Sequence, residues 1–134
     1  MKIHLFIYIF AFIILSCDHK ESQQSGAFIQ NVNAEKFKEL IEAGKGITLD
    51  VRTPEEVLEG YIGTAIAINI YDEDFEQKIN FLAKDEEIYV YCKVGGRSSK
   101  AAEILLENGF KKVYHLENGI VEWKEKGLPL SFPK

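Results

Sequence analysis

The sequence predicts an α/β fold, a three-layer sandwich with a central parallel sheet of about five strands. Two observations predict it. Short runs rich in β-branched residues alternate with segments of helical periodicity, and residues that start or stop helices separate them. Strands joined through helices pair in parallel through right-handed crossovers, which leaves helices on both faces of the sheet. A length of 134 residues suits one domain of this kind.

The first half of the predicted domain contains two helix starts and two strands. Asn33 is a suitable N-cap for a helix over residues 34–44, whose apolar residues share one face and which a glycine ends. A β-branched run predicts a strand over residues 47–51. Thr53 is followed by a proline and, three residues later, by a glutamate, which is the pattern of a capping box. The apolar run at residues 65–70 predicts a second, buried strand.

The second half repeats the alternation of helix and strand. Helical spacing of apolar residues predicts a helix over residues 72–83, and the run IYVY predicts a strand over residues 88–91. A helix over residues 98–108 follows and is closed by a glycine. The last strand is expected over residues 113–116, and the last helix over residues 120–126, before a glycine and a proline.

The front of the chain does not follow this pattern. Eleven apolar residues from Leu5 to Leu15 make up the core of a signal peptide, too short for the about 20 residues that span a bilayer as a helix. The run ends at the residues ILSC and resembles the lipobox of bacterial lipoproteins, although Leu15 is bulkier than the usual residue there. In that family the signal is cut before the cysteine, whose thiol is acylated.

This resemblance divides the chain into a lipoprotein signal peptide at residues 1–16, the lipidated Cys17 with a polar tether at residues 17–27, and a domain at residues 28–134. It implies an exported bacterial lipoprotein, anchored in a lipid bilayer through acylated Cys17 and facing the periplasm or the cell exterior. A plain secretory signal and an uncleaved anchor are the alternatives.

The composition argues against several classes of function. Sixteen Lys and Arg against 21 Asp and Glu give a net charge of −5, so no nucleic-acid partner is expected. The two cysteines and three scattered histidines lack the spacing of a metal site, and we expect neither a metal nor a cofactor. We expect the domain to be a monomer.

The chemistry is expected in the loop after the strand at residues 88–91. Cys92 ends this strand, and its neighbours are Lys93, Val94, Gly95, Gly96, Arg97 and Ser98. Two glycines let the backbone turn its amides toward one centre, and the following helix adds the positive end of its dipole. Such a loop stabilises a thiolate and should lower the pKa of Cys92, while Lys93 and Arg97 add positive potential. A nucleophile that attacks an anion is therefore favoured over a small buried core residue.

Four blocks of the sequence resemble the single-domain rhodanese (thiosulfate sulfurtransferase-like) family. Residues 49–56 (LDVRTPEE) resemble its LDVR-x-x-x-E element, and residues 59–66 (EGYIGTAI) its E-G-H-I-P-G-A-I segment. Residues 92–98 resemble its C-x-x-G-x-R-S loop. Residues 116–123 and 127–129 resemble its closing L-x-G-G-x-x-x-W…G-x-P run. Together the resemblance spans residues 28–132, which is nearly the whole chain after the expected signal peptide.

The resemblance implies sulfur transfer through a persulfide on Cys92. The donor is a small sulfur-containing anion such as thiosulfate, or a persulfide, and the acceptor is cyanide or a thiol. The loop amides from Lys93 to Ser98 would bind the transferred sulfur and its oxyanion partner. Asp50 and Arg52 would support the loop, with a surface ion pair as the alternative for these two residues.

Two further residues are expected to be structural. Trp123 is expected to pack in the core, and His115 to pack at the end of a strand rather than to act in catalysis. The sequence departs from the family pattern at Tyr61 (usually His), at Gly63–Thr64 (usually Pro-Gly) and at Asn118 (the first glycine of a pair). These departures lie outside the loop at residues 92–98 and concern the geometry of local turns.

Two other functions stay open. Cysteine phosphatases and arsenate reductases of related architecture use a Cys-x5-Arg loop, whereas four residues separate Cys92 from Arg97 here, which favours the sulfurtransferase. A sulfur carrier or binding module without turnover is the third possibility, and the presence of Cys92 does not exclude it.

Overall fold

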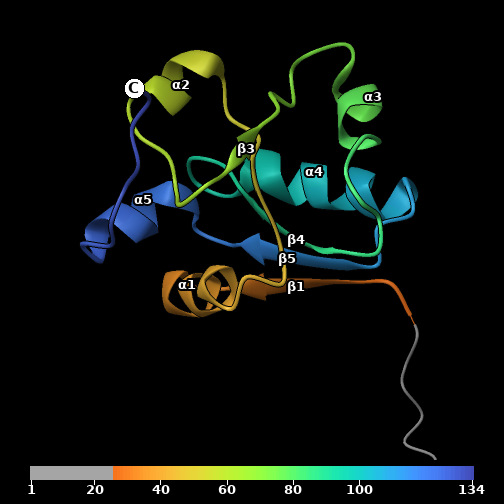
Figure 1. Cartoon of the computed structure of the whole chain (residues 1–134), viewed down its shortest axis with the longest axis horizontal. Coiled ribbons are helices and arrows are strands. Elements are labelled where there is room, and N and C mark those ends of the chain that lie inside the picture. The colour runs from red at the N-terminus through yellow and green to blue at the C-terminus, as the bar shows by residue number, and fades with distance from the viewer. Residues whose placement is uncertain (1–25) are drawn as a thin grey trace, which may run out of the picture.

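The computed structural model describes residues 26–134 and contains one sheet of five parallel strands in the order β1-β5-β4-β2-β3. This sheet, with helices on both faces, confirms the predicted fold class (Figure 1). The strands are β1 (Phe28–Val32), β2 (Gly46–Asp50), β3 (Ile66–Ala67), β4 (Glu87–Tyr91) and β5 (Lys112–Leu116). The helices are α1 (Ala34–Glu42), α2 (Pro54–Leu58), α3 (Phe75–Ile79), α4 (Gly96–Glu107) and α5 (Gly119–Glu125).

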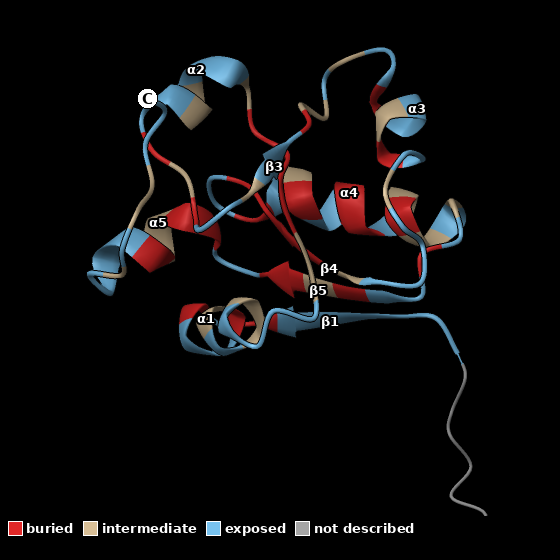
Figure 2. Ribbon diagram, in the orientation of Figure 1, coloured by how far each residue is buried: buried red, intermediate tan, exposed pale blue. Residues whose placement is uncertain are grey.

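The two faces of the sheet are covered by different helices. Side chains of α3 and α4 pack with β2, β4 and β5 in one apolar cluster, and side chains of α1 and α5 pack with β1, β4 and β5 in the other. Figure 1 shows α4 and α1 on opposite sides of the strands. Buried residues lie along β4 and on one side of α4 (Figure 2). Burial of both apolar faces provides the main stabilisation of the fold.

The helix starts that the sequence predicts are confirmed. The Oδ1 atom of Asn33 accepts a hydrogen bond of 2.9 Å from the amide of Lys36 and caps α1. Thr53 and Glu56 form the predicted capping box of α2, in which each side chain accepts a hydrogen bond from the other residue's amide. Each cap satisfies amides that the first turn of a helix leaves unpaired.

The elements that differ most from prediction are the two edge strands of the sheet and one short helix. The strand predicted at residues 65–70 has only two paired residues, both exposed, because β3 is an edge strand with β2 as its sole neighbour in the described sheet. The helix predicted at residues 72–83 extends only over α3. Strand β1 was not predicted, because its mostly exposed residues show no apolar alternation.

The strand register brings the carboxyl ends of the central strands to one edge. Asp50, the last residue of β2, pairs with Tyr91, the last residue of β4, and Val90 pairs with His115 of β5. Ligand sites of parallel sheets lie beyond this edge. The loop that begins at Cys92 is therefore at the expected place.

The predicted signal peptide at residues 1–16, the predicted lipidation site at Cys17 and the predicted tether up to residue 25 lie outside the described residues. Within residues 26–134, no helix is both long enough and apolar enough to cross a membrane.

Candidate active site

The loop from Cys92 to Arg97 depends on the left-handed backbone of one glycine. Gly95 has a φ of 109°, and a Cβ atom at this position would lie 1.9 Å from the carbonyl oxygen of Glu117. A Cβ atom on Gly96 would meet no atom within 4 Å, and α4 begins at this residue. Only the first of the two glycines is therefore required by the shape of the loop.

The start of α5 holds the other side of the loop. The amides of Ile120 and Val121 donate hydrogen bonds of 2.9 and 3.1 Å to the carbonyls of Cys92 and Lys93. Gly119 has a φ of 65°, and a Cβ atom there would lie 2.2 Å from the carbonyl oxygen of Lys93. Asn118 has a φ of −102°, so the departure from the family's glycine pair falls where no glycine is needed.

The thiol of Cys92 is free, buried and surrounded by hydrogen-bond donors. The residue is 1% exposed. The amide of Gly95 lies 3.1 Å from Sγ, and the hydroxyl of Ser98 lies 3.3 Å from it. Burial by itself raises the pKa of the thiol, but hydrogen bonds from the Ser98 side chain and from the amides of Ser98, Gly95 and Val94 more than offset this effect. The pKa of Cys92 is therefore lowered, as the sequence predicts for a loop that stabilises a thiolate.

Arg97 is partly buried and is paired with an acid. Both terminal nitrogens of its guanidinium lie 2.7 Å from oxygens of Glu56. The side chains of Arg97 and Glu56 are 21% and 24% exposed, so solvent screens this pair only in part. The hydrogen bonds from Arg97 lower the pKa of Glu56 to about 2. The positive potential expected from Arg97 is thus largely compensated by the carboxylate, whereas Lys93 is exposed.

Asp50 and Arg52 form a buried network beside the loop. Their side chains are 0% and 2% exposed, which rules out the alternative of a surface ion pair. The guanidinium of Arg52 donates to both oxygens of Asp50 and to the carbonyls of Glu56 and Gly60. The hydroxyl of Tyr91 donates a hydrogen bond of 2.7 Å to Asp50. Since Tyr91 precedes Cys92, the pair holds the end of β4 in place.

The two residues expected to be structural are both buried. Trp123 is 3% exposed and its indole N–H donates to the carbonyl of Pro129, which confirms a core position. His115 is 4% exposed at the end of β5, as predicted, but its Nε2 atom lies 2.7 Å from the hydroxyl of Ser98. Sequence analysis missed this contact because the two residues are 17 positions apart and no motif links them.

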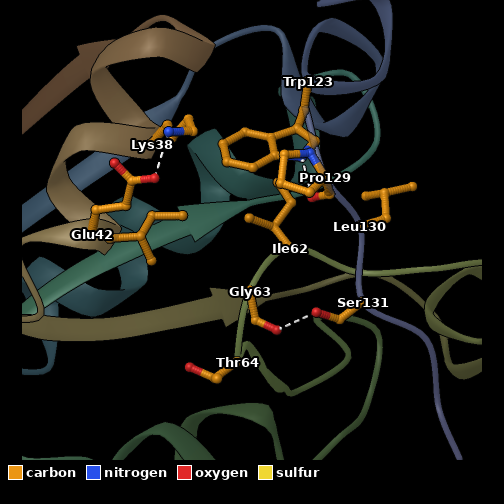
Figure 3. A pocket seen from close by; sticks show the side chains of 10 residues that line it. Lys38, Glu42, Ile62, Gly63, Thr64, Trp123, Pro129, Leu130 and Ser131 are labelled. Atoms are coloured by element: carbon orange, nitrogen blue, oxygen red, sulfur yellow. Dashed lines mark hydrogen bonds and ion pairs between the residues drawn. The ribbon is translucent and has the colours of Figure 1, made fainter. Parts of the chain in front are cut away.

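A cavity of about 300 Å³ lies apart from the thiol, between α1, α5 and the C-terminal segment (Figure 3). Its wall is mostly apolar and includes Ile62, Trp123 and Leu130. Several polar groups at this wall are paired with one another: Lys38 pairs with Glu42, and the hydroxyl of Ser131 donates to the carbonyl of Gly63 (Figure 3). The reactive thiol of Cys92 does not line this cavity. Within residues 26–134, no cluster of three His, Cys, Asp or Glu side chains could hold a metal ion.

Comparison with known proteins identifies the family. The family model of the rhodanese-like domain matches residues 33–126, which is more than half of the chain. The chain belongs to the rhodanese-like family. This rhodanese-like domain is 34% identical to the crystal structure of a rhodanese-related protein from Thermoplasma volcanium, with a TM-score of 0.69 over 78% of this chain and 99% of that chain. A rhodanese-like domain protein from Staphylococcus aureus is 30% identical, with a TM-score of 0.67 over 78% and 99% of the two chains.

Curated relatives of this rhodanese-like domain are longer proteins. The tRNA uridine(34) hydroxylase of Yersinia pestis is 35% identical over 109 residues, which cover 75% of this chain and 31% of that protein. The protein of the same name from Yersinia enterocolitica is 34% identical over the same shares. The chain thus spans about a third of the length of these relatives.

Proposed function

We propose that the protein is a sulfurtransferase that carries a sulfane sulfur as a persulfide on Cys92. The observation that carries this proposal is the thiol itself, whose Sγ accepts hydrogen bonds from Gly95 and Ser98 and whose pKa is lowered. Because its pKa is lowered, this thiol supplies more of the thiolate, which is the nucleophile that attack on sulfur requires. Family membership and the six-residue loop from Cys92 to Arg97 support the same reaction.

The first half-reaction loads the cysteine. The thiolate of Cys92 attacks the outer sulfur of thiosulfate, and a new S–S bond forms while the bond between the two thiosulfate sulfurs breaks. Sulfite leaves with the electron pair of that bond, and Cys92 keeps the sulfur as a persulfide anion. The loop amides that stabilise the thiolate lie next to this new negative charge.

The second half-reaction transfers the sulfur from Cys92 to the acceptor. A thiolate or cyanide attacks the outer sulfur of the persulfide, and the S–S bond to Cys92 breaks. The electron pair returns to Cys92, which becomes a thiolate again, and the acceptor leaves as a persulfide or as thiocyanate. Neither half-reaction consumes an external oxidant or reductant, so no cofactor is needed.

The burial of Cys92 favours a small donor. The residue is 1% exposed, whereas Lys93 and Val94 of its loop are exposed. A donor must therefore approach Sγ past the loop, and a compact anion or a persulfide group at the end of a flexible molecule fits this requirement. A phosphate ester needs contacts from a wider ring of amides, which argues against the phosphatase alternative.

The hydroxylation of tRNA that the names of the curated relatives state has less support here. The chain covers 31% of those proteins. Its net charge of −5 disfavours binding to the phosphates of RNA. The shared region is the rhodanese-like domain.

We propose further that the protein acts at a membrane surface, anchored through acylated Cys17. The support is the ILSC sequence that ends the apolar run. Cells that express the protein should incorporate labelled palmitate into the wild type and not into Cys17→Ala. Equal labelling of both proteins would refute the anchor without affecting the proposal for Cys92.

Steady-state assays test the proposed reaction. With thiosulfate and cyanide, the wild type should release sulfite and thiocyanate, and Cys92→Ser should release neither, because a hydroxyl is a far poorer nucleophile. The same two proteins are then incubated with an aryl phosphate. Hydrolysis of the phosphate by the wild type, without sulfite release from thiosulfate, would contradict the sulfurtransferase and favour the phosphatase.

A further inference from the structure

His115 is a buried titratable side chain that the reaction proposed above does not use. It lies at the end of β5, is 4% exposed, and belongs to the face of the sheet that α4 covers. A buried imidazole needs partners for both ring nitrogens, because each unpaired polar atom costs about 1–3 kcal/mol. The partners of this ring connect it to the reactive thiol.

The contacts of His115 form a continuous path to Cys92. Nε2 of His115 lies 2.7 Å from Oγ of Ser98, and Oγ of Ser98 lies 3.3 Å from Sγ of Cys92. On the other side of the ring, Nδ1 lies 3.0 Å from Oδ1 of Asn31. The four side chains come from the end of β4, from α4, from β5 and from β1, so the fold and not a local motif assembles them.

The position of Asn31 selects the form of the imidazole. Its carbonyl oxygen accepts a hydrogen bond from Nδ1–H, and Nε2 of the neutral ring is then free to accept the hydroxyl proton of Ser98. The hydroxyl oxygen of Ser98 can in turn accept the S–H of Cys92. Every proton in this arrangement has an acceptor.

We propose that Ser98 and His115 form a proton relay that takes the thiol proton of Cys92 and stores it on the imidazole. Cys92 gives its proton to Oγ of Ser98, and Ser98 gives its own hydroxyl proton to Nε2 of His115. The products are a thiolate and an imidazolium. In this state Ser98 donates to Sγ, Nε2–H lies 3.1 Å from the carbonyl of Gly95, and Nδ1–H still donates to Asn31.

The surroundings of the ring suit both states. Burial lowers the pKa of His115, so the ring starts as a neutral proton acceptor, and the carbonyl of Gly95 and the carboxylate of Glu117 oppose this effect in part. Glu117, which follows β5, is the charged group that acts on the ring. Cys92, which follows β4, is titratable and is linked to the ring through Ser98 of α4, and β1 contributes the neutral Asn31. A negative charge on Sγ favours the imidazolium.

Only one step of the relay, the return of the proton to Cys92, rests on the proposed sulfur transfer. When the acceptor breaks the persulfide bond, the departing Cys92 thiolate can recover the proton from His115 through Ser98. Formation of the thiolate needs no sulfur donor and can be measured without one. His115 acts through Ser98 and is a positioning residue, whereas Ser98 contacts the reacting sulfur.

The test is the pH profile of Cys92 alkylation in the full chain. Iodoacetamide reacts with the thiolate, and the modified peptide that contains Cys92 is quantified by mass spectrometry, which separates it from Cys17. The wild type should show two inflections, one for the thiolate–imidazolium pair and one for loss of the imidazolium proton. His115→Gln keeps a side-chain donor and acceptor but cannot store a proton, so it should show one inflection, about one pH unit higher than the first inflection of the wild type.

Tyr114→Phe is the matched control, because residue 114 lies on the opposite face of β5 and packs against Phe28 and Tyr89. Its profile should superpose on that of the wild type. A folded His115→Gln protein with the wild-type profile would overturn the relay. Should His115→Gln fail to fold, Asn31→Ala at the exposed edge decides in the same way: a smaller upward shift supports the relay, and an unchanged profile overturns it.

Failure of the relay and failure of sulfur transfer give different results. Two inflections in a protein that releases no sulfite from thiosulfate would keep the relay and reject the proposed function. Sulfite release with a single inflection, unchanged in His115→Gln, would keep the function and reject the relay.

Discussion

The carboxylate of Glu56 binds both terminal nitrogens of Arg97 at 2.7 Å, and it also serves in the capping box of α2. One acidic side chain therefore stabilises the start of α2 and also compensates the positive charge of Arg97 in the loop after Cys92. A negative charge on Cys92 raises the pKa of Arg97, so the two groups are close enough to interact. We therefore expect Glu56 to reduce the positive potential that Arg97 adds near the thiol.

Glu56→Gln should make the protein react faster with thiosulfate. The amide keeps an oxygen for the cap and for Arg97 but removes the negative charge, so the arginine attracts an anionic donor more strongly. An added interaction of about 1 kcal/mol corresponds to a roughly fivefold gain in kcat/KM. Glu55→Gln makes the same change of charge one residue away, at an exposed position, and should have little effect. Loss of the difference at high salt would support the electrostatic cause; equal rates for all three proteins at low salt would refute it.

The stability of the protein at acid pH should depend on the same residue. The hydrogen bonds from Arg97 lower the pKa of Glu56 from its ordinary value of 4.5 to about 2. The folded state therefore holds the ionised carboxylate, and this stabilisation is complete above pH 4.5 and is lost as the pH falls toward 2. In urea denaturation, the free energy of unfolding should fall more steeply over this range for the wild type than for Glu56→Gln. If the unfolding free energy fell equally steeply with pH in both proteins, the pairing of Arg97 with Glu56 would be contradicted.

The two glycines of the loop should differ in their tolerance of alanine. Gly95→Ala places a Cβ atom 1.9 Å from the carbonyl of Glu117 and at a positive φ, so it should destabilise the protein by more than about 1 kcal/mol. Gly96→Ala lies at the start of α4 in open space and should be neutral, or stabilising by up to about 1 kcal/mol. Thermal unfolding of the two variants makes the comparison, and a similar loss for both would show that the loop does not have this shape.

The hydroxyl of Tyr91 should matter more than that of its neighbour in the same strand. It donates to Asp50 at 2.7 Å and accepts the amide of Ile62 at 3.0 Å, both in the interior. Tyr91→Phe leaves these groups unpaired and should cost about 1–3 kcal/mol of unfolding free energy. Tyr89→Phe removes a hydroxyl that donates to the half-buried Glu87, and it should cost less. The reverse order in urea denaturation would contradict the buried network.

Much of the fold could be predicted because the central strands are short apolar runs between clear helix signals. The strands near residues 47–51, 88–91 and 113–116 lie within one residue of β2, β4 and β5. The edges could not be predicted in the same way. Strand β1 is mostly exposed and β3 pairs at two positions, so their sequences carry little of the burial that makes a strand visible.

The candidate site also contains one part that could be predicted from the sequence and one part that could not. Cys92 and its loop are contiguous, so their chemistry could be inferred from residue types and order alone. The partners of this loop come from distant segments: Glu56 lies 41 residues from Arg97, and Asn31 lies 84 residues from His115. No spacing rule links such pairs, because the crossovers of the sheet bring them together. The burial of Asp50 and Arg52 could likewise not be predicted, because the same two residues in sequence are equally compatible with a surface ion pair.

Sulfur transfer by the proposed route requires that Cys92 itself carry the transferred sulfur. The direct test is the mass of the peptide that contains Cys92 after the full chain is treated with thiosulfate and the excess is removed without a reductant. We expect the addition of one sulfur atom to this peptide in the wild type, released sulfite in equal amount, and loss of the added mass on treatment with cyanide. Cys92→Ser should gain no mass. A wild-type peptide that stays unmodified, or a sulfur atom found on Cys17 alone, would contradict the account.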